Sequence, residues 1–276
     1  MNTPTPDQFK QGVKQTFDLV AGGYDTPAMR YFPFSADSLA DRLKARRGEK
    51  VLDVATGTGQ VAMAIAQSTG PQGRVQAIDI SDKMLDKAML NIQKAGLTNI
   101  DLHTMDAERL DFKSQYFDAA SCAFGLFFLP DMQKGVNEIF RVLKPGGRFI
   151  FTSFTSQAFA PLIDLFRDHM AEFNIQIPDE QWRLLANEQH CLKLLDEAGF
   201  IDTQANKQQL GYHLAGQIDW WEILYSSGLR AMLEQLEPAQ LTEFRTRHLA
   251  EIDKLKTDKG IWLDVEVLFT FGIRPA

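Results

Sequence analysis

The sequence has little cysteine and no obvious export signal. Its 276 residues include only Cys122 and Cys191, which lie far apart and form neither a CxxC pair nor a metal-ligand spacing. We therefore expect reduced thiols and no bound metal. The first ten residues, MNTPTPDQFK, lack the basic and apolar regions of a secretory signal. These features predict a cytoplasmic protein.

Positive charge and long apolar runs are also scarce. The 29 lysines and arginines and 36 aspartates and glutamates give a formal net charge of -7, and no block of five like charges occurs. Because such a surface repels polyanions, we expect no nucleic-acid partner. The longest charge-free apolar run, AASCAFGLFFLP from Ala119, is too short to span a bilayer. We therefore expect no membrane span.

Between about residues 50 and 155, short apolar runs alternate with helical patterns. VLDVA precedes GQVAMAIAQS, RVQAIDI precedes DKMLDKAMLNIQKAG, and FDAASCAF precedes MQKGVNEIFRVL. This alternation predicts an α/β fold with a mostly parallel sheet that is covered by helices on both faces. The alternating residues of WLDVEVLF, within a predicted strand IWLDVEVLFTFGI, favour an antiparallel strand near a sheet edge.

Further helices do not fit this alternation. One, FKQGVKQTFDLVA, ends at Gly22-Gly23, and another carries Phe159, Leu162, Phe166 and Met170 at helical spacing. Two more are predicted over DWWEILYSSGLRAMLEQL and PAQLTEFRTRHLAEIDKL, and Gly96 and Gly199 are predicted to end helices. FIDTQANKQQLGYHL is expected to form one strand.

The stretch VLDVATGTGQVA, from Val51 to Ala62, reads as strand, glycine turn and helix, the order typical of a nucleotide site. GTGQVA also fits the dinucleotide pattern G-x-G-x-x-A. Asp53, however, ends the strand and would face a pyrophosphate. Two unit charges about 4 Å apart interact by roughly 4 kcal/mol at an effective dielectric near 20. A ligand with a cationic group is therefore favoured.

The whole stretch resembles the acidic-x-Gly-x-Gly-x-Gly motif of Rossmann-like S-adenosylmethionine-dependent methyltransferases. Ala55 stands where that family usually has its first glycine, and we expect a strand-like backbone there, which alanine tolerates. Asp79 and Asp106 end the next two predicted strands, where the family binds the ribose and the adenine amino group. EIFRVLKPGGRFIFTSF is similar to the family's passage into the fifth strand.

The N-terminal half is also similar to the quinone-ring C-methyltransferases of ubiquinone and menaquinone synthesis. Those enzymes usually have an Arg-Asn pair shortly after their Phe-Gly, where this sequence has Phe127 and Phe128. The resemblance implies a seven-stranded sheet, S-adenosyl-L-methionine as cofactor and a small, largely apolar or aromatic methyl acceptor. It leaves open whether carbon, oxygen or nitrogen is methylated, and whether the protein is a monomer or a homodimer.

The resemblance also implies site residues and a domain organisation. The predicted cofactor-binding residues are Tyr24, Asp53, Ala55, Thr56, Gly57, Gly59, Asp79, Ile80, Met84, Asp106, Ala107 and Phe124. Predicted walls of the acceptor site are Phe124, Phe127, Phe128, Phe154 and Phe159, with Trp220 and Trp221. No catalytic residue is predicted from the five histidines. Within a single domain, 1–276, we expect a helical lid over 1–36, a cofactor-binding core over 37–155, capping insertions over 156–186 and 215–258, and the rest of the sheet over 187–214 and 259–276.

Three alternatives remain open at this point. A nicotinamide-dependent oxidoreductase also has a Rossmann turn, but Asp53 and Asp106 count against it. An RNA methyltransferase is disfavoured by the negative charge. A non-catalytic relative that keeps the fold as a binding module is the third.

Overall fold

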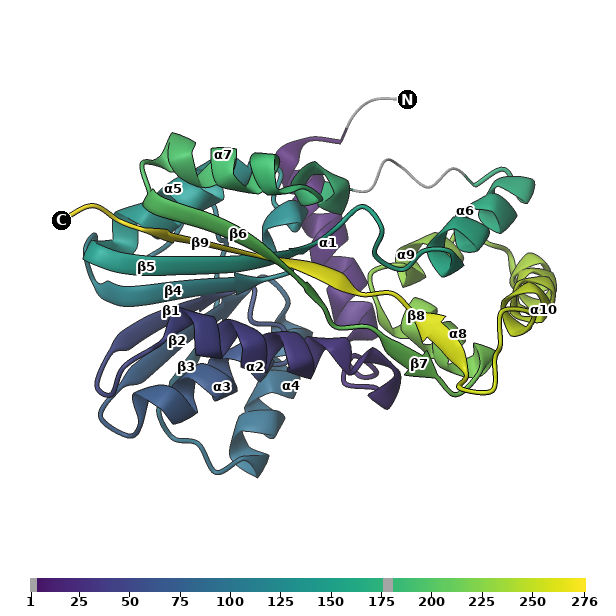
Figure 1. Ribbon diagram of the computed structural model, residues 1–276, viewed down its shortest axis with the longest axis horizontal. Helices are drawn as coiled ribbons and strands as arrows, with labels where there is room; N and C mark the ends of the chain where they lie inside the picture. Colours follow the sequence, from purple (N-terminus) through teal and green to yellow (C-terminus); the bar gives the residue numbers. More distant parts are fainter. Residues whose placement is uncertain (1–3, 176–180) are drawn as a thin grey trace.

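The computed structural model, which describes residues 4–175 and 181–276, has a central sheet, helices on both faces and a helical cap at one end (Figure 1). The 7 strands lie in the order β3-β2-β1-β4-β5-β9-β6. Their bounds are β1 (Lys50–Val54), β2 (Arg74–Asp79), β3 (Ile100–Thr104), β4 (Phe117–Ala123), β5 (Leu143–Phe154), β6 (Ile201–Gln209) and β9 (Glu266–Ile273). Strands β1 to β5 pair in parallel, and β9 runs antiparallel to both β5 and β6. The predicted fold class is therefore confirmed.

Helices on the two faces explain why the central strands are apolar throughout. Helices α2 (Tyr31–Leu43) and α3 (Gln60–Thr69) pack against each other, as do α5 (Met132–Val142) and α7 (Glu188–Ala198) on the opposite face (Figure 1). Helix α4 (Asp82–Lys94) packs on β2 and β3. The side chains of β1 after Lys50 are consequently excluded from solvent. As predicted, Gly96 and Gly199 follow helix ends, with φ of 68° and 93°.

A helical cap lies at the end of the sheet where the parallel strands terminate (Figure 1). It contains α6 (Leu162–Glu172), α8 (Gln217–Ser226), α9 (Arg230–Leu233), α10 (Pro238–Asp253) and a hairpin of β7 (Tyr212–Leu214) and β8 (Ile261–Leu263). Short 3-10 helices are η1 (Pro27–Met29), η2 (Leu126–Phe128) and η3 (Gln181–Leu185). No helix in the described ranges is both long enough and apolar enough to cross a membrane.

The structure corrects four predicted elements. The helix expected from Asp219 is interrupted at Ser227-Gly228, which separates α8 from α9. Each of the two long C-terminal strands is also broken in two, because β7 and β8 leave the main sheet to pair with each other. At Gly211, between β6 and β7, a Cβ would lie 2.5 Å from the Leu263 carbonyl oxygen, so this turn requires glycine. Phe159 precedes α6 and has a positive φ of 67°.

Helix α1 (Pro6–Val20) lies beside α4, across the ends of the parallel strands (Figure 1). It begins with a capping box in which the Thr5 hydroxyl accepts from the Gln8 N–H and the Gln8 amide accepts from the Thr5 N–H. Val20 is the only side chain of the helix that is fully buried. Most of the helix is thus a surface layer and contributes little to the main core.

Candidate functional site

The glycine turn joins β1 to α3 at the centre of the sheet. Gly57 and Gly59 have φ of 54° and 86°, in the region that disfavours side chains. A Cβ on Gly59 would lie 3.2 Å from the Ala88 Cβ, so this glycine lets the start of α3 pack closely on α4. The backbone of the turn is therefore left facing the space beyond the strand ends.

Ala55 departs from the expectation of a strand-like backbone. Its φ is 54°, which is the left-handed region. An L-residue with a Cβ is strained there by about 1–2 kcal/mol relative to glycine. A Cβ on the neighbouring Gly125 would in turn lie 2.5 Å from the Ala55 Cβ. The prediction was wrong because a glycine in the motif indicates a left-handed conformation, which alanine adopts here under strain.

Asp53, at the end of β1, is a buried carboxyl group with two hydroxyl donors. Its Oδ2 accepts from the Thr56 hydroxyl at 2.6 Å and its Oδ1 from the Ser121 hydroxyl at 2.7 Å. Burial is the largest cause that raises the pKa of Asp53 to about 6, and the nearby charge of Asp79 adds to it. A cation beside Asp53 would lower that pKa again.

Asp79 ends β2 and connects it to the glycine turn. Its Oδ2 accepts from the Gly57 N–H at 2.8 Å, and its Oδ1 from the Ser81 N–H at 2.9 Å. Burial raises its pKa above the ordinary value. A carboxylate has about four acceptor positions, so the group can still accept a hydroxyl donor from a ligand.

Asp106, just after β3, is held by α1. Its Oδ1 accepts from the Glu108 N–H at 2.9 Å, and its Oδ2 from the Lys10 Nζ at 2.7 Å. Lys10 also donates to the buried carboxylate of Glu108 at 2.8 Å. Lys10 was not predicted as a site residue, because nothing in the sequence shows that α1 crosses the end of β3.

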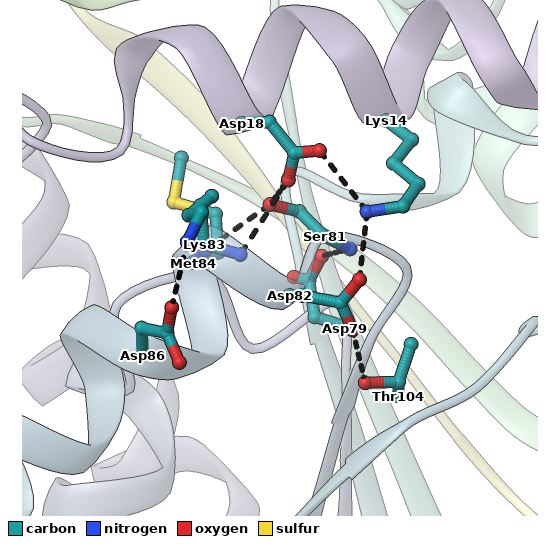
Figure 2. Close-up of polar contacts among 9 residues, drawn as sticks. All are labelled: Lys14, Asp18, Asp79, Ser81, Asp82, Lys83, Met84, Asp86 and Thr104. Atoms are coloured by element: carbon teal, nitrogen blue, oxygen red, sulfur yellow. Dashed lines mark hydrogen bonds and ion pairs between the residues drawn. The ribbon is translucent and has the colours of Figure 1, made fainter.

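Figure 2 shows a second group of polar contacts that holds α1 against the start of α4. The Ser81 hydroxyl donates to Asp18 at 2.6 Å, while Lys14 donates to Asp18 at 3.0 Å and to Asp82 at 2.9 Å. Asp82 also accepts from the Thr104 hydroxyl at 2.6 Å. The contacts of Lys10, Lys14 and Asp18 together place α1 over the ends of β2 and β3.

Two adjoining cavities lie along these strand ends. One of about 170 Å³, the turn cavity, lies between the glycine turn and η1. The other, the strand-end cavity, is about 90 Å³ and lies between α1 and the ends of β2 and β3. All the predicted cofactor residues except Gly59 line one or both: Tyr24, Asp53, Ala55, Thr56, Gly57, Asp79, Ile80, Met84, Asp106, Ala107 and Phe124. Their role in binding stays a prediction.

A third and larger space, the aromatic cavity, has a volume of about 500 Å³ under the cap. All five phenylalanines predicted as acceptor-site walls line it: Phe124, Phe127, Phe128, Phe154 and Phe159. Tyr24 and Phe124 line all three cavities. The aromatic cavity therefore meets the other two at these rings.

The predicted tryptophans of the acceptor site do not line the aromatic cavity. Trp220 is 0% exposed and donates its indole N–H to His248 Nε2 at 2.9 Å. Trp221 packs near Phe244 of α10. The tryptophan that lines the cavity is Trp182 of η3, which the sequence did not single out. The prediction failed because the interior of the cap needs large side chains of its own.

Several residues that line the turn cavity were also missed. Asp25 accepts from the Thr58 hydroxyl at 2.7 Å and from the Asn91 amide at 2.9 Å, so it ties the turn to α4. Arg30 lines the same cavity and donates to the His213 carbonyl oxygen at 2.9 Å. Both residues follow the predicted Tyr24 closely in the sequence. Asp25, directly after Tyr24, could have been predicted as a site residue from that position.

The histidines lie elsewhere. None of the five lines the three cavities. His248 is fully buried in the cap, 2.9 Å from His169 between their Nδ1 atoms, and burial lowers its pKa to about 3. Since the Trp220 N–H occupies its Nε2, His248 carries its proton on Nδ1 and donates to His169. Within the described residues, no group of three or more potential metal ligands gathers.

Comparison with known proteins gives concordant matches. Residues 7–210 match the model of the ubiE/COQ5 methyltransferase family. Aklanonic acid methyltransferase DauC of Streptomyces sp. (strain C5) is 33% identical over 177 residues, which span 63% of this chain and 80% of DauC. The ubiquinone/menaquinone biosynthesis C-methyltransferase UbiE of Serratia proteamaculans is 36% identical over 170 residues, 56% of this chain and 67% of UbiE.

The fold is similar to that of a solved methyltransferase. Phosphoethanolamine N-methyltransferase 2 of Haemonchus contortus, in complex with S-adenosyl-L-methionine, superposes with a TM-score of 0.60 at 17% identity. The match covers 97% of this chain and 60% of that protein. At 17% identity, this similarity is evidence for the fold alone.

Proposed function

Since this chain belongs to the ubiE/COQ5 methyltransferase family, and is an S-adenosylmethionine-dependent methyltransferase, we propose that it methylates a small aromatic molecule bound in the aromatic cavity. The observation that carries this proposal is the meeting of the three cavities at Tyr24 and Phe124. A methyl donor bound along the strand ends would there face an acceptor under the cap. The relatives are methyltransferases, and they give no support to a nicotinamide oxidoreductase.

The acidic residues at the strand ends fit the cofactor. We propose that Asp79 binds the ribose hydroxyls, since it is buried, lines the strand-end cavity and is a charged acceptor. Asp53, whose neighbours donate only neutral hydrogen bonds, would bind the ammonium group in the turn cavity. Asp106 and the Ala107 amide would bind the adenine edge, with Ile80 and Met84 against its faces.

The remaining predicted residues would complete the cofactor site. The backbone of Ala55, Thr56 and Gly57 lets the methionine portion approach closely, while Gly59 acts through the packing of α3 on α4. The rings of Tyr24 and Phe124 lie where the sulfonium would meet the aromatic cavity. Aromatic faces attract such a cation by about 0.5–2 kcal/mol.

The chemistry places few demands on the protein. The cofactor supplies a methyl group on a sulfonium that leaves as a neutral thioether. The chain's own residues then need to align the acceptor and exclude water. Orientation of two bound reactants is worth roughly 7–11 kcal/mol of barrier. Val13 and Phe17 of α1 line both the strand-end and the aromatic cavity. We propose that α1 is a lid that aligns the acceptor and excludes water.

The names of the relatives support a ring-shaped acceptor. DauC acts on aklanonic acid, and UbiE is a C-methyltransferase of ubiquinone and menaquinone synthesis. The aromatic cavity offers rings from Phe127, Phe154 and Trp182 for stacking. We propose that the enzyme works in the cytoplasm, as a monomer or a homodimer, on a free metabolite.

Methyl-labelled cofactor and a panel of phenols, quinols, enols and amines test this proposal. We expect label in an organic-soluble aromatic product, and weaker labelling at limiting cofactor concentration in the Asp79→Ala variant, which removes the proposed ribose contact. Label that appeared only in RNA or in protein would contradict the proposal.

A further inference from the structure

The aromatic cavity contains few polar side chains, and most are already hydrogen-bonded to backbone. Gln8 accepts from the Thr5 N–H in the cap of α1, and the Thr16 hydroxyl donates to the Gly12 carbonyl oxygen at 3.0 Å. The Ser227 hydroxyl accepts from the Leu229 N–H at 3.3 Å. Each of these three side chains therefore already has a hydrogen bond to backbone close to it in sequence.

Tyr24 and Tyr31 differ from these three. Both line the aromatic cavity, and in the described part of the chain neither hydroxyl makes a hydrogen bond within 3.5 Å. Phe32 holds both rings, stacked on Tyr24 at 5.0 Å and tilted against Tyr31 at 4.5 Å between ring centroids. Tyr31 also contacts Phe159 edge to face at 5.7 Å. The two phenols are thus fixed by packing.

The surroundings keep both phenols protonated. Burial raises the pKa of Tyr24 above its ordinary value, and the charges of Asp79 and Asp25 add to the effect. Burial likewise raises the pKa of Tyr31, with smaller contributions from Tyr24 and Tyr212. Two neutral phenols on residues that line a largely apolar cavity are donors that favour an oxygen acceptor, and most strongly an ionised one.

We propose that Tyr24 and Tyr31 hold an ionised oxygen of the acceptor, which is a phenol or enol acidified by a neighbouring carbonyl or other electron-withdrawing group. This inference rests on the proposed function and specifies its substrate class. Every described side chain that lines the aromatic cavity is uncharged, whereas Lys10, Asp79 and Asp106 line the strand-end cavity. Asp25, Asp53 and Arg30 line the turn cavity.

Methyl transfer to such an acceptor needs no side chain of the aromatic cavity to act as a base. The acceptor gives its proton to water before it binds. Its electron pair, on oxygen or on the conjugated carbon of the enolate, forms the bond to the methyl carbon. The carbon–sulfur bond breaks and its electrons stay on sulfur, so an anion and a sulfonium become two neutral products.

The binding test uses nitrophenols, whose absorbance reports ionisation, in the presence of S-adenosylhomocysteine. We expect the pKa of the bound nitrophenol to be lower in the wild type than in Tyr24→Phe or Tyr31→Phe, and the phenolate to bind about tenfold to a hundredfold more weakly to either variant. Tyr225→Phe, at a 39% exposed tyrosine of α8, is the matched control. Equal bound pKa values in all four proteins, or binding of the neutral phenol alone, would overturn the proposal.

A kinetic test separates this inference from the proposed function. With acceptors of graded acidity, we expect the midpoint of the kcat/KM against pH curve to follow the acidity of each acceptor. A midpoint common to all of them would overturn the inference and leave the methyltransfer to aromatic acceptors intact. If no aromatic compound were bound or methylated, both the inference and the proposed function would be overturned.

Discussion

Asp53 is the residue whose charge state most directly reports a bound cation. Its pKa of about 6 exceeds that of an ordinary aspartate, so the folded free protein holds this proton more tightly than the unfolded chain does. The associated stability is present at low pH and is lost as the pH rises through about 6. An ammonium ligand reverses this effect, because it favours the ionised form.

Cofactor affinity is therefore expected to rise as the pH increases from 5 to 7 and then to level off. Asp53→Asn should remove most of this pH dependence and weaken binding at pH 7 by about tenfold, roughly 1.4 kcal/mol. The same variant should unfold at a higher temperature than the wild type at pH 7, because a buried charge is gone. Calorimetric titration and thermal melts at several pH values measure the two effects. A pH-independent affinity in the wild type would contradict the assignment.

Asp79→Ala tests the proposed ribose contact. The substitution removes hydrogen bonds between a charged group and the ligand, which are worth about 1.5–3 kcal/mol. We expect that loss in the affinity for S-adenosylhomocysteine, measured by calorimetry. Since the Gly57 and Ser81 N–H groups also lose their acceptor, Asp79→Asn is the milder companion variant. Normal binding by Asp79→Ala would show that the ribose lies elsewhere.

Ala55→Gly tests the strain at the turn. The left-handed φ of 54° destabilises an alanine by about 1–2 kcal/mol. Glycine avoids this strain, but it loses more conformational entropy on folding, which offsets part of the gain in stability. We expect the variant to be more stable by up to about 1 kcal/mol in chemical denaturation. Ala250→Gly, at an exposed position of α10, should be destabilised by about 0.5–1 kcal/mol instead. Destabilisation by both substitutions would contradict the assigned strain.

At the scale of elements, α1 is held more by charge than by apolar burial. Deletion of residues 1–19 keeps the buried Val20 and removes Lys10, Lys14 and Asp18, whose partners lie just after β3 and at the start of α4. We expect the core to stay folded and the affinity for S-adenosylhomocysteine to fall about tenfold, roughly 1.4 kcal/mol. Lys10→Met should show part of this loss, whereas Lys193→Met, at an exposed ion pair of α7, should show none. Full affinity after the deletion would contradict the role of α1 as a lid.

The cap has a pH dependence of its own. His248 has a pKa of about 3 in the folded protein, below the ordinary 6.5. Its contribution to stability is therefore complete above pH 6.5 and is lost as the pH falls, by about 1.4 kcal/mol per pH unit at the steepest. In denaturation between pH 7 and 4, His248→Gln should reduce this slope. An unchanged slope would mean that another group causes the acid sensitivity.

The elements also show how far a single sequence can be interpreted. Apolar runs alternating with helices predicted the sheet and its flanking helices, because burial on both faces leaves a clear pattern in parallel strands. The cap was predicted less well, since breaks at Gly211 and Gly228 depend on contacts between distant segments. Lys10 was missed for the same reason, because its partners Asp106 and Glu108 are about a hundred residues away.

At the scale of the whole molecule, the structure brings a polar crevice at the strand ends together with an apolar cavity under the cap. The motif predicted the first, since each carboxylate ends a strand and strand ends of a parallel sheet lie together. The phenylalanines predicted the apolar cavity. Trp220 was wrongly predicted to line it, because a packed cap and a ligand cavity both use large aromatic side chains. We infer the chemical class of the acceptor from the phenols of Tyr24 and Tyr31, which line this cavity.

A crystal structure of the protein with S-adenosylhomocysteine tests the central claim most directly. The account predicts the ribose hydroxyls within hydrogen-bonding distance of Asp79, the ammonium beside Asp53, and the sulfur between Tyr24 and Phe124 with the aromatic cavity open in front of it. A nucleoside bound away from these strand ends, or a sulfur directed away from the aromatic cavity, would contradict it.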